Sequence, residues 1–408
     1  MSPRRKAAEG DMSGKLPSPS RPAQVVFYND PKVRSVVYQL VLCAVVAFLV
    51  YGAVRNAADN LARAHIASGF GFWNDTAGFD ISQTLIDYSA RASTYGRAFW
   101  VGLLNTLLVS ALGILFATIL GFVIGISRLS RNWLLSKVAG GYVETIRNLP
   151  LLLQLLFWYN AVLKALPDIR ESIVIPGGAF LNNRGLFLPL PIFKSGFGAV
   201  EIVLLAGIAG TIAFHIWARK RQARTGQQAP VLWAALVLVV GLPLSAFGLA
   251  GIPLGFEFPQ AGRFNITGGI EVLPEFVALL FGLSIYTAAF IAEVVRAGIL
   301  AVSGGQTEAA YSLGLRPGPT LRLIVIPQAM RVIIPPLTSQ YLNLTKNSSL
   351  AVAIGYPDLV QVFTGTVLNQ TGQAVEVVAI TMLVYLVISL ATSLLMNIYN
   401  SRMALRER

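Results

Sequence analysis

Residues 308–327 read EAAYSLGLRPGPTLRLIVIP, and this stretch decides how the rest of the chain is interpreted. It fits a spaced pattern: Glu-Ala-Ala, three residues, Gly314, nine residues, and then Ile-x-Ile-Pro ending at Pro327. The stretch begins in the last quarter of the chain, between two strongly apolar segments. A short EAA string alone is weak evidence, but the whole spaced pattern in this position indicates a built element rather than an ordinary amphipathic loop.

The residues around this stretch predict a helix–turn–helix. Ser303 and Gln306 fit a capping box, in which the serine side chain accepts from the helix and the glutamine reaches back. The short helix that they open is predicted to end before Gly314, which can take the positive φ of a C′ residue. Proline suits the first turn of a helix, so Pro317 or Pro319 is predicted to open a second short helix.

The same element carries the features of a docking surface. Ala309 and Ala310 keep one face slim enough to enter a groove on another protein, and the helix dipole favours Glu308 in the first turn. With Gly314, Ile324 and Pro327, these are the residues that we expect to define the element.

Composition places the chain in the membrane. Of its 408 residues, 55% are hydrophobic and 12% are charged, whereas a soluble domain carries about 25% charged residues. Mean hydropathy is +0.64, and several apolar runs approach the ~20 residues that span a bilayer. Backbone groups in hydrocarbon must be paired internally, so these runs are predicted to be helices. The fold class is therefore all-α, a polytopic membrane protein with about eight transmembrane helices, near 35–54, 98–126, 140–165, 197–218, 231–252, 275–299, 332–354 and 374–398.

The formal net charge of +13 reflects orientation in the membrane rather than nucleic-acid binding. With the N-terminus placed inside, 21 Lys and Arg residues fall in segments predicted to face the cytoplasm and 8 in those predicted to face outside. This asymmetry favours both termini in the cytoplasm, and it places 308–327 on the same side.

Other chemistry finds little support in the sequence. Cys43 is the only cysteine, so no disulfide or cysteine-based metal site forms within one chain. A metal site needs several ligands at suitable spacing, and the two histidines are His65 and His215; the lone His215 is better explained by packing. The polar, proline-rich tail before residue 35 is not a cleavable signal. Aromatic residues in 55–97 are expected to lie flat at the membrane interface, or alternatively to form a docking surface.

Charged and polar groups in or beside the helices are the remaining candidates. Glu144 and Arg147 share a helical face, as do Glu293 and Arg296, so each pair is predicted to hold helices in register. Pro150 is predicted to kink the third helix. Polar side chains at membrane depth face the bundle interior or a cavity, or they bond between helices. Candidate pathway-lining residues on this argument are Gln154, Asn160, Tyr286, Thr287, Lys346, Asn347, Ser348 and Ser349.

These stretches together resemble a known family. The spaced EAA pattern, YVETIRNLPLLLQ at 142–154, SIYTAAFIAEVVRAG at 284–298 and the segment 327–355 resemble permease subunits of polar amino-acid ABC importers, the histidine/glutamine/arginine uptake family. The likeness covers roughly 95–165 and 275–400. With its insertion at 166–274 and the stretch LTKNSSLAVAIGYPDL, the chain most resembles the larger permease of the general L-amino-acid importers of Gram-negative bacteria.

Composition, hydropathy and the resemblance together predict a domain organisation. The chain then divides into a disordered cytoplasmic tail (1–34), a first membrane helix with a periplasmic loop (35–97), and a transmembrane domain with an ABC importer type I-like permease core (98–399). That domain contains the insertion (166–274) and a cytoplasmic coupling loop (303–331).

The resemblance also implies a function. The chain is expected to be a multi-pass permease subunit in the bacterial inner membrane, without catalytic residues or a cofactor of its own. ATP is expected to be bound by a separate ABC ATPase, since the chain has no G-x-x-x-x-G-K-[ST] loop. Further expected partners are a second, shorter permease, a periplasmic amino-acid-binding protein, membrane lipid and an amino-acid substrate. Alternatives are an ion-gradient-driven secondary amino-acid transporter, although we detect no internal repeat, and a membrane enzyme, although we find no nucleophile motif or metal-ligand cluster.

Overall fold

The structure is a computed structural model that describes residues 31–63, 68–262 and 265–403. The chain divides into two compact units, Met1–Ser68 and Gly69–Arg408. The first unit contains α1 (Pro31–Arg63), within which Val33–Asn56 is long and apolar enough to cross a bilayer. This agrees with the membrane helix predicted near 35–54. The predicted tail 1–34 lies outside the described residues except for 31–34, which begin α1.

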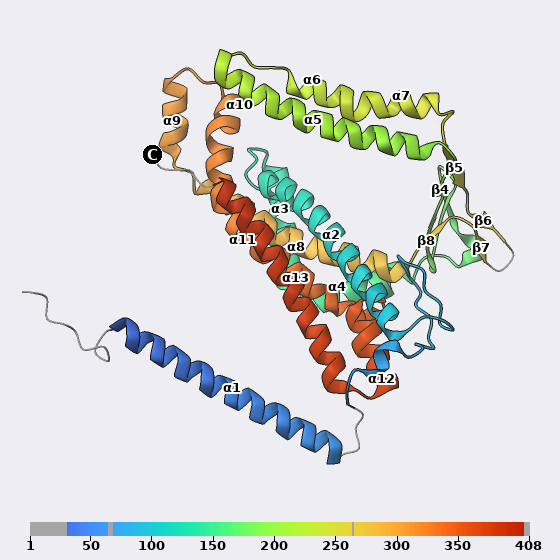
Figure 1. Ribbon diagram of the computed structural model, residues 1–408. Helices are drawn as coiled ribbons and strands as arrows, with labels where there is room; N and C mark the ends of the chain where they lie inside the picture. Colours follow the sequence, from blue (N-terminus) through green and yellow to red (C-terminus); the bar gives the residue numbers. More distant parts are fainter. Residues whose placement is uncertain (1–30, 64–67, 263–264, 404–408) are drawn as a thin grey trace, which may run out of the picture. The chain divides into compact units, whose positions relative to one another are not determined.

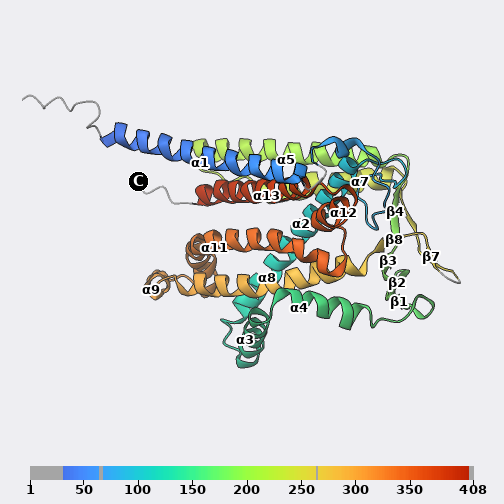
Figure 2. The same ribbon diagram turned by 90° about the horizontal axis from the view of Figure 1, so that it is seen from below.

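The core of the second unit is built on the crossing of α2 (Tyr95–Ser127) and α8 (Pro274–Leu300), seen in Figures 1 and 2. Glycines let these helices approach closely: a Cβ on Gly121 would lie 2.5 Å from Ile291 Cγ2, and one on Gly125 would lie 2.7 Å from the Ala292 carbonyl oxygen. Small residues at helix crossings are a common means of packing in membranes, where no hydrophobic driving force exists between helices.

Further helices surround this crossing, and α11 packs against both α8 and α13. They are η2 (Gly71–Asn74), α3 (Trp133–Asn148), α4 (Leu151–Leu156), η3 (Phe157–Leu163), η4 (Ile169–Glu171), α9 (Gly304–Ser312), α10 (Pro317–Thr320), η6 (Leu321–Val325), α11 (Ile326–Asn347), η7 (Ser348–Ile354), η8 (Val360–Val367), α12 (Leu368–Thr371) and α13 (Ala374–Met403). In the part of the chain that the structure describes, seven helices are long and apolar enough to cross a membrane. The predicted class, a helical polytopic membrane protein, is confirmed.

The helix predicted at 140–165 is not continuous. It is divided into α3 and α4, because Leu149 takes an extended backbone (φ −98°, ψ 132°) directly before Pro150. Proline clashes with a helical residue before it and has no N–H to donate. What remains beyond the break is a short apolar helical run, Leu151–Leu163, so Pro150 breaks the helix rather than kinking it.

A second boundary also differs from the prediction. The short helix expected to begin at Pro317 or Pro319 does begin at Pro317, but it continues through η6, α11 and η7 as one helical run to Ile354. The π-helical turn η6 ends directly before Ile326–Pro327. Pro327 lies in the first turn of α11, where proline is tolerated. Pro335 and Pro336 lie inside α11 without ending it.

The insertion 166–274 contains the two predicted apolar helices and also short strands that the sequence did not indicate. The helices are α5 (Phe197–Thr225) and a second run made of α6 (Val231–Leu236), η5 (Val237–Gly241) and α7 (Leu242–Leu249). The strands are β1 (Ile173–Ile175), β2 (Ala179–Asn182), β3 (Gly185–Leu188), β4 (Leu190–Phe193), β5 (Leu254–Glu257), β6 (Gln260–Ala261), β7 (Ile266–Thr267) and β8 (Ile270–Val272).

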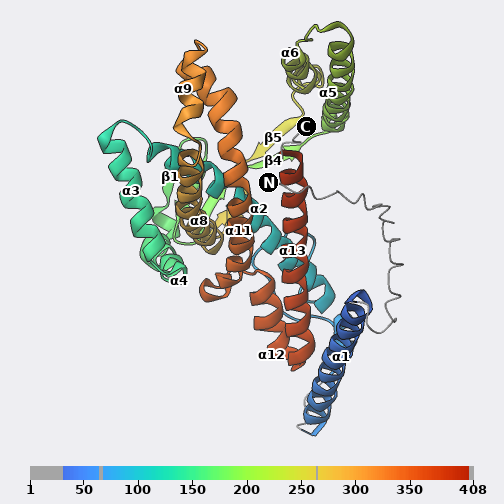
Figure 3. The same ribbon diagram turned by 90° about the vertical axis from the view of Figure 1, so that its left-hand side faces the viewer.

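These strands form three small antiparallel sheets, ordered β1-β2-β3-β8, β4-β5 and β6-β7. β4 leads into α5, and β8 leads directly into α8, so the strands gather where both helices begin (Figure 1). Figure 3 shows α5 and α6 set apart from α2 and α8 and joined to them through β4 and β5. The insertion therefore adds a helical hairpin beside the core, with its strands at one end.

The aromatic residues before α2 are largely used in packing within the chain rather than presented together on its surface. Phe72 is buried, with its ring 6.1 Å from Tyr95 and 6.2 Å from Phe363, and Trp73 packs 5.2 Å from Phe99. Their apolar area is used in a second core cluster that fixes the segment before α2. Phe70, by contrast, is exposed.

Candidate functional site

The EAA stretch forms α9, a short helix that lies between α8 and α10. Ser303 is its N-cap residue as predicted, but its side chain makes no capping hydrogen bond, because the backbone carbonyl oxygen of Ser303 accepts from Gln306 N at 3.0 Å. The side chain of Gln306 turns away and accepts from Gln328 Nε2 at 3.3 Å. The capping box is therefore not formed, and Gln306 instead links α9 to the beginning of α11.

The turn after α9 has the geometry predicted for it. Gly314 has φ +77°, its N–H donates to the Tyr311 carbonyl oxygen at 2.9 Å, and Leu315 N donates to the Ala310 carbonyl oxygen at 3.1 Å. These two bonds make a Schellman motif, which satisfies carbonyl groups at the helix end. The turn therefore requires a residue that tolerates the left-handed region.

The docking residues predicted on α9 separate into two groups. Glu308 and Ala309 are exposed, whereas Ala310 is buried inside the chain at 1% exposure. Only Ala309 of the alanine pair is therefore available to a partner, and Ala310 permits close packing within the element. Ile324 lies half-buried in η6, and Pro327 lies half-buried in the first turn of α11.

An ion-pair network lies where α2, α3 and α8 meet. Arg128, at the end of α2, contacts Glu293 on α8, and its second nitrogen lies 3.8 Å from Glu144 on α3. Arg296 lies 2.6 Å from Glu293, so this pair forms as its spacing predicts.

The other predicted pair, Glu144 with Arg147, does not form. The Arg147 guanidinium lies over the Phe290 ring at 5.1 Å, a favourable cation–π arrangement, while Glu144 faces Arg128. The Glu144 carboxylate therefore faces a cation from another helix. Arg128 links α2, α3 and α8, a connection that the sequence did not indicate.

Four of the predicted pathway residues lie on α4, η3 and α8, and one of them, Gln154, lines a pocket of about 360 Å³. Gln154 is buried and donates from Nε2 to the carbonyl oxygens of Ile146 (3.0 Å) and Leu149 (3.1 Å), which places it at the break between α3 and α4. The exposed Asn160 bonds within its own helix. The ring of the half-buried Tyr286 packs 4.9 Å from that of Phe290, and Thr287 is buried.

Lys346 and Ser349 line a pocket of about 430 Å³ between α11, η7, η8 and α13. The other polar members of the lining come from α13: Thr381, Tyr385 and Ser389. Asn347 and Ser348, which follow Lys346, are half-buried and buried, and Ser348 Oγ donates to the Thr345 carbonyl oxygen at 2.7 Å. The sequence analysis missed the three polar residues of α13, although their spacing of four residues marks one face of an otherwise apolar helix.

Asp358 is a second residue that the sequence analysis missed. It lies between two membrane-length helices yet is fully buried, and its carboxyl accepts from Gln361 N at 2.8 Å and from Tyr385 Oη at 3.2 Å. Burial raises the pKa of Asp358 from 3.8 to about 7, against the hydrogen bonds, which lower it. A buried carboxyl group favours its neutral form in this way.

The backbone around Asp358 is docked on α2. Asn105 Nδ2 donates to the Pro357 carbonyl oxygen at 2.8 Å, and Leu359 N donates to Thr106 Oγ1 at 3.0 Å. A Cβ on Gly102 would lie 3.0 Å from Leu359 Cα, so the two backbones are in close contact. This docking fixes η8, and with it one wall of the pocket beside Lys346.

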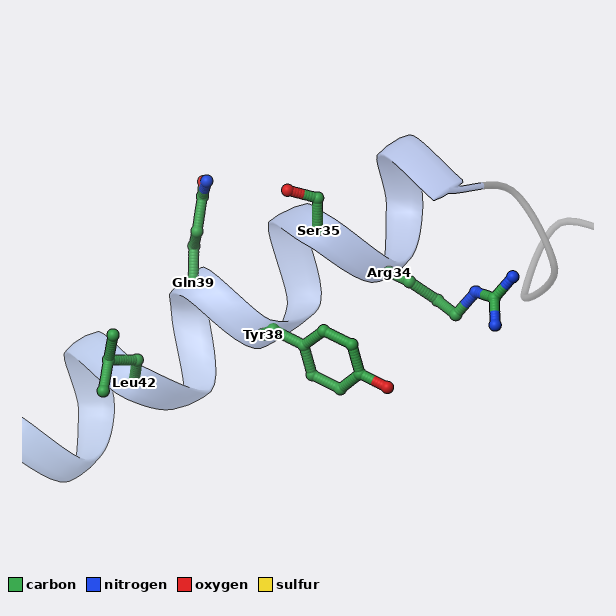
Figure 4. Close-up of a pocket in the computed structure, with 5 residues that line it drawn as sticks. All are labelled: Arg34, Ser35, Tyr38, Gln39 and Leu42. Carbon is green, nitrogen blue, oxygen red and sulfur yellow. The ribbon is translucent and has the colours of Figure 1, made fainter.

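Another hollow, of about 480 Å³, lies along α1 and is lined by Arg34, Ser35, Tyr38, Gln39 and Leu42 (Figure 4). All five side chains project from this one helix, so no second element among the lining residues closes the hollow. We assign it no role. Within 31–63, 68–262 and 265–403 the structure also holds no group of three or more His, Cys, Asp or Glu residues suited to a metal ion.

Comparison with known proteins agrees with this architecture. Residues 113–405 match the family model of binding-protein-dependent transport system inner membrane components. The chain is 56% identical over 93% of its length to the general L-amino acid transport system permease protein AapQ of Rhizobium johnstonii, covering 94% of that protein. It is 52% identical to the putative amino-acid ABC transporter permease protein YhdX of Escherichia coli, with 93% and 97% of the two chains covered.

A third relative is the glutamate/glutamine/aspartate/asparagine transport system permease protein BztB of Rhodobacter capsulatus. Identity to it is 43%, over 93% of this chain and 96% of the relative. The family match covers most of the chain and includes α9, the Lys346 pocket and the docked segment around Asp358. The chain therefore belongs to the family of inner membrane components of binding-protein-dependent transport systems, as a multi-pass permease subunit.

Proposed function

We propose that this chain is the permease subunit of an ATP-driven importer that carries amino acids across the bacterial inner membrane. The observation that carries this proposal is the match at 56% identity to a general L-amino acid permease. That alignment covers 93% of the chain, so it extends through the insertion as well as the family core. Two further relatives that match along nearly their whole length also bear amino-acid transport in their names.

We assign α9 as the contact with the ATPase. Its exposed groups include Glu308 and Tyr311, which is 50% exposed, and Leu313, directly after the helix, is 82% exposed. Large exposed apolar side chains rimmed by polar groups mark interaction sites. ATP would be bound and hydrolysed by that partner, and this chain would supply no catalytic residue.

The remaining assembly follows from the same proposal. Two ATPase copies would dock on two permease chains, this one and a shorter relative, and a periplasmic binding protein would deliver the amino acid. Both termini and 303–331 would then face the cytoplasm, as the distribution of Lys and Arg predicts. In this orientation the strands of the insertion would face the periplasm.

We assign the pocket beside Lys346 to the transport pathway. A lysine at membrane depth is costly unless it faces a polar cavity, and the hydroxyl groups of Ser349, Tyr385 and Ser389 line the same pocket. An ammonium group and several hydroxyls suit the carboxylate that amino acids share. Closure of the ATPases would move α9, and the continuous helix from Pro317 to Ile354 would carry that movement to the pocket.

The test is recovery of the tagged chain from its native membrane in gentle detergent, together with uptake of labelled amino acids. An ATPase and a second permease are expected to co-purify, and uptake is expected to stop on ATP depletion. Lys346→Met should abolish uptake with the complex intact, whereas the control Lys164→Met, at the end of the short helix after α4, should not. Uptake that survives ATP depletion and fails when ion gradients are dissipated would replace this proposal with a secondary transporter.

A further inference from the structure

The helical hairpin of the insertion is a membrane element in its own right. Phe197–Thr225 and Val231–Leu249 are both long and apolar enough to cross a bilayer. The two helices pack tightly on each other, since a Cβ on Gly207 would lie 2.0 Å from the Leu238 carbonyl oxygen. Their outer faces are apolar and open, as at Ile202 (69% exposed) and Leu232 (71% exposed). Exposed apolar area on all outer sides is what lipid chains cover.

One end of this hairpin is strongly basic. Arg219, Lys220, Arg221 and Arg224 are four exposed bases within six positions at the end of α5. The sequence from 202 to 249 contains no Asp or Glu to neutralise them. We call these four residues the α5 basic cluster. It lies at the end of α5 away from the strands, on the side to which α8 also runs and from which α9 follows (Figure 1).

Two tryptophans mark the level of the membrane interface at this end. Trp217 is 50% exposed and Trp233 is 70% exposed, the first near the end of α5 and the second near the beginning of α6. Tryptophan is enriched at the headgroup level of bilayers. The cluster follows Trp217 by two to seven residues, or about 3 to 10 Å along the helix axis, which is the depth of the headgroup layer.

The arrangement of the bases favours lipid over a protein partner. At about 100° per residue, the four side chains extend around more than half of the helix circumference, whereas a docked protein would cover one face. The Arg221 guanidinium lies over the Trp217 ring at 5.4 Å and donates to Gln227 Oε1 at 3.3 Å. These contacts hold one cation at the level of the indole ring, where phosphate groups of lipids lie.

We propose that the α5 basic cluster binds the headgroups of acidic phospholipids, with Trp217 and Trp233 setting its depth in the bilayer. Clusters of Lys and Arg directly beside a membrane helix gain about fivefold in affinity for anionic lipid per base. If these bases only set the orientation of the chain in the membrane, they could lie anywhere in a short cytoplasmic loop. The proposal therefore requires a preference for acidic lipid that depends on these positions and not on net charge.

The experiment is native mass spectrometry of the full chain in detergent, titrated with phosphatidylglycerol and, separately, with phosphatidylcholine. The double variant R219Q/R224Q is compared with the control R131Q/K137Q, which removes one exposed base between α2 and α3 and another near the beginning of α3. A charge-conserving variant, R219K/R221K/R224K, tests for damage to the structure. The wild-type titration is repeated at rising NaCl concentration, which needs no variant to fold.

The expected result is tighter binding of phosphatidylglycerol than of phosphatidylcholine, weakened about 25-fold in R219Q/R224Q. The preference should persist in the control and in the lysine variant, and it should decline with salt in the wild type. Equal loss in R219Q/R224Q and R131Q/K137Q would show that affinity follows net charge and would overturn the proposal. The proposal would also be overturned if R219Q/R224Q kept its preference for phosphatidylglycerol. Loss of a co-purifying protein subunit from that variant, with lipid binding unchanged, would overturn it as well.

Discussion

Replacing Gly314 tests whether the turn after α9 carries the coupling function. The residue has φ +77°, and a Cβ built on it meets nothing within 4 Å. A substitution therefore adds backbone strain without a steric clash. The left-handed region costs an L residue about 1–2 kcal/mol, and asparagine tolerates it better than alanine or valine.

This cost should reduce the population of the docking-competent turn by about 5- to 30-fold for Gly314→Ala. Impairment is predicted to be mildest for Gly314→Asn, greater for Gly314→Ala and greatest for Gly314→Val, because β-branched side chains are the least tolerant of positive φ. Gly318→Ala is the matched control: Gly318 lies in α10 with ordinary helical φ and open space around its Cβ position. There alanine should be neutral or slightly favourable.

The assay is recovery of the ATPase with the purified chain, together with the initial rate of ATP-driven uptake in vesicles that contain equal amounts of each variant. Gly314→Val is expected to remain in the membrane but to lose ATPase recovery and uptake together. Normal uptake by Gly314→Val, or equal losses in Gly314→Ala and Gly318→Ala, would refute the reasoning that the left-handed turn matters for coupling.

Three further predictions concern stability, each measured as the melting temperature of the purified protein. The pKa of Asp358 is raised from 3.8 to about 7 in the folded chain. Its neutral form therefore adds up to about 4 kcal/mol to the free energy of unfolding below pH 4, and this contribution is lost as pH rises through 7. Asp358→Asn should remove this pH dependence, and an unchanged pH profile in that variant would contradict the prediction. Arg128→Gln should cost about 1–3 kcal/mol because it leaves the partly buried Glu293 with one cation fewer, an effect that a neutral result would exclude. Gly207→Ala should destabilise the hairpin by more than 1 kcal/mol, since the added methyl overlaps the Leu238 carbonyl oxygen. Gly198→Ala, with open space around its Cβ position, should not. Equal melting temperatures for Gly207→Ala and Gly198→Ala would contradict the tight packing of the two helices.

The sequence predicted the features that depend on local pattern. Apolar runs located the long helices, and the turn at Gly314 followed from helix-capping chemistry. The break before Pro150 was anticipated only as a kink, because the sequence pattern does not show that Leu149 leaves the helical conformation for an extended one. Strands such as β6, which has two residues, are too short to give an alternating pattern.

The parts of the site that the sequence did not reveal depend on tertiary contacts. Asp358 was counted within an outside loop, and its burial arises only because the segment docks on Asn105 and Thr106 of α2. The partner of Glu144 was misassigned because Arg128, sixteen positions away in sequence, lies closer in space than Arg147. Lys346 was found from its polarity, but the face of α13 that completes its pocket came from the structure.

The helical run from Pro317 to Ile354 forms a lever with two weak points, the π-helical turn η6 and the pair Pro335 and Pro336 inside α11. From η6 to Lys346 the distance along the axis is about 35 Å, and no loop interrupts it. A tilt of about 5° at the end beside α9 would thus displace the Lys346 end by about 3 Å, a movement comparable to the diameter of a water molecule. Pro335 and Pro336 lie between η6 and Lys346, and each removes a backbone hydrogen bond from the helix. Bending at these two prolines would therefore set how much of the swing reaches the pocket.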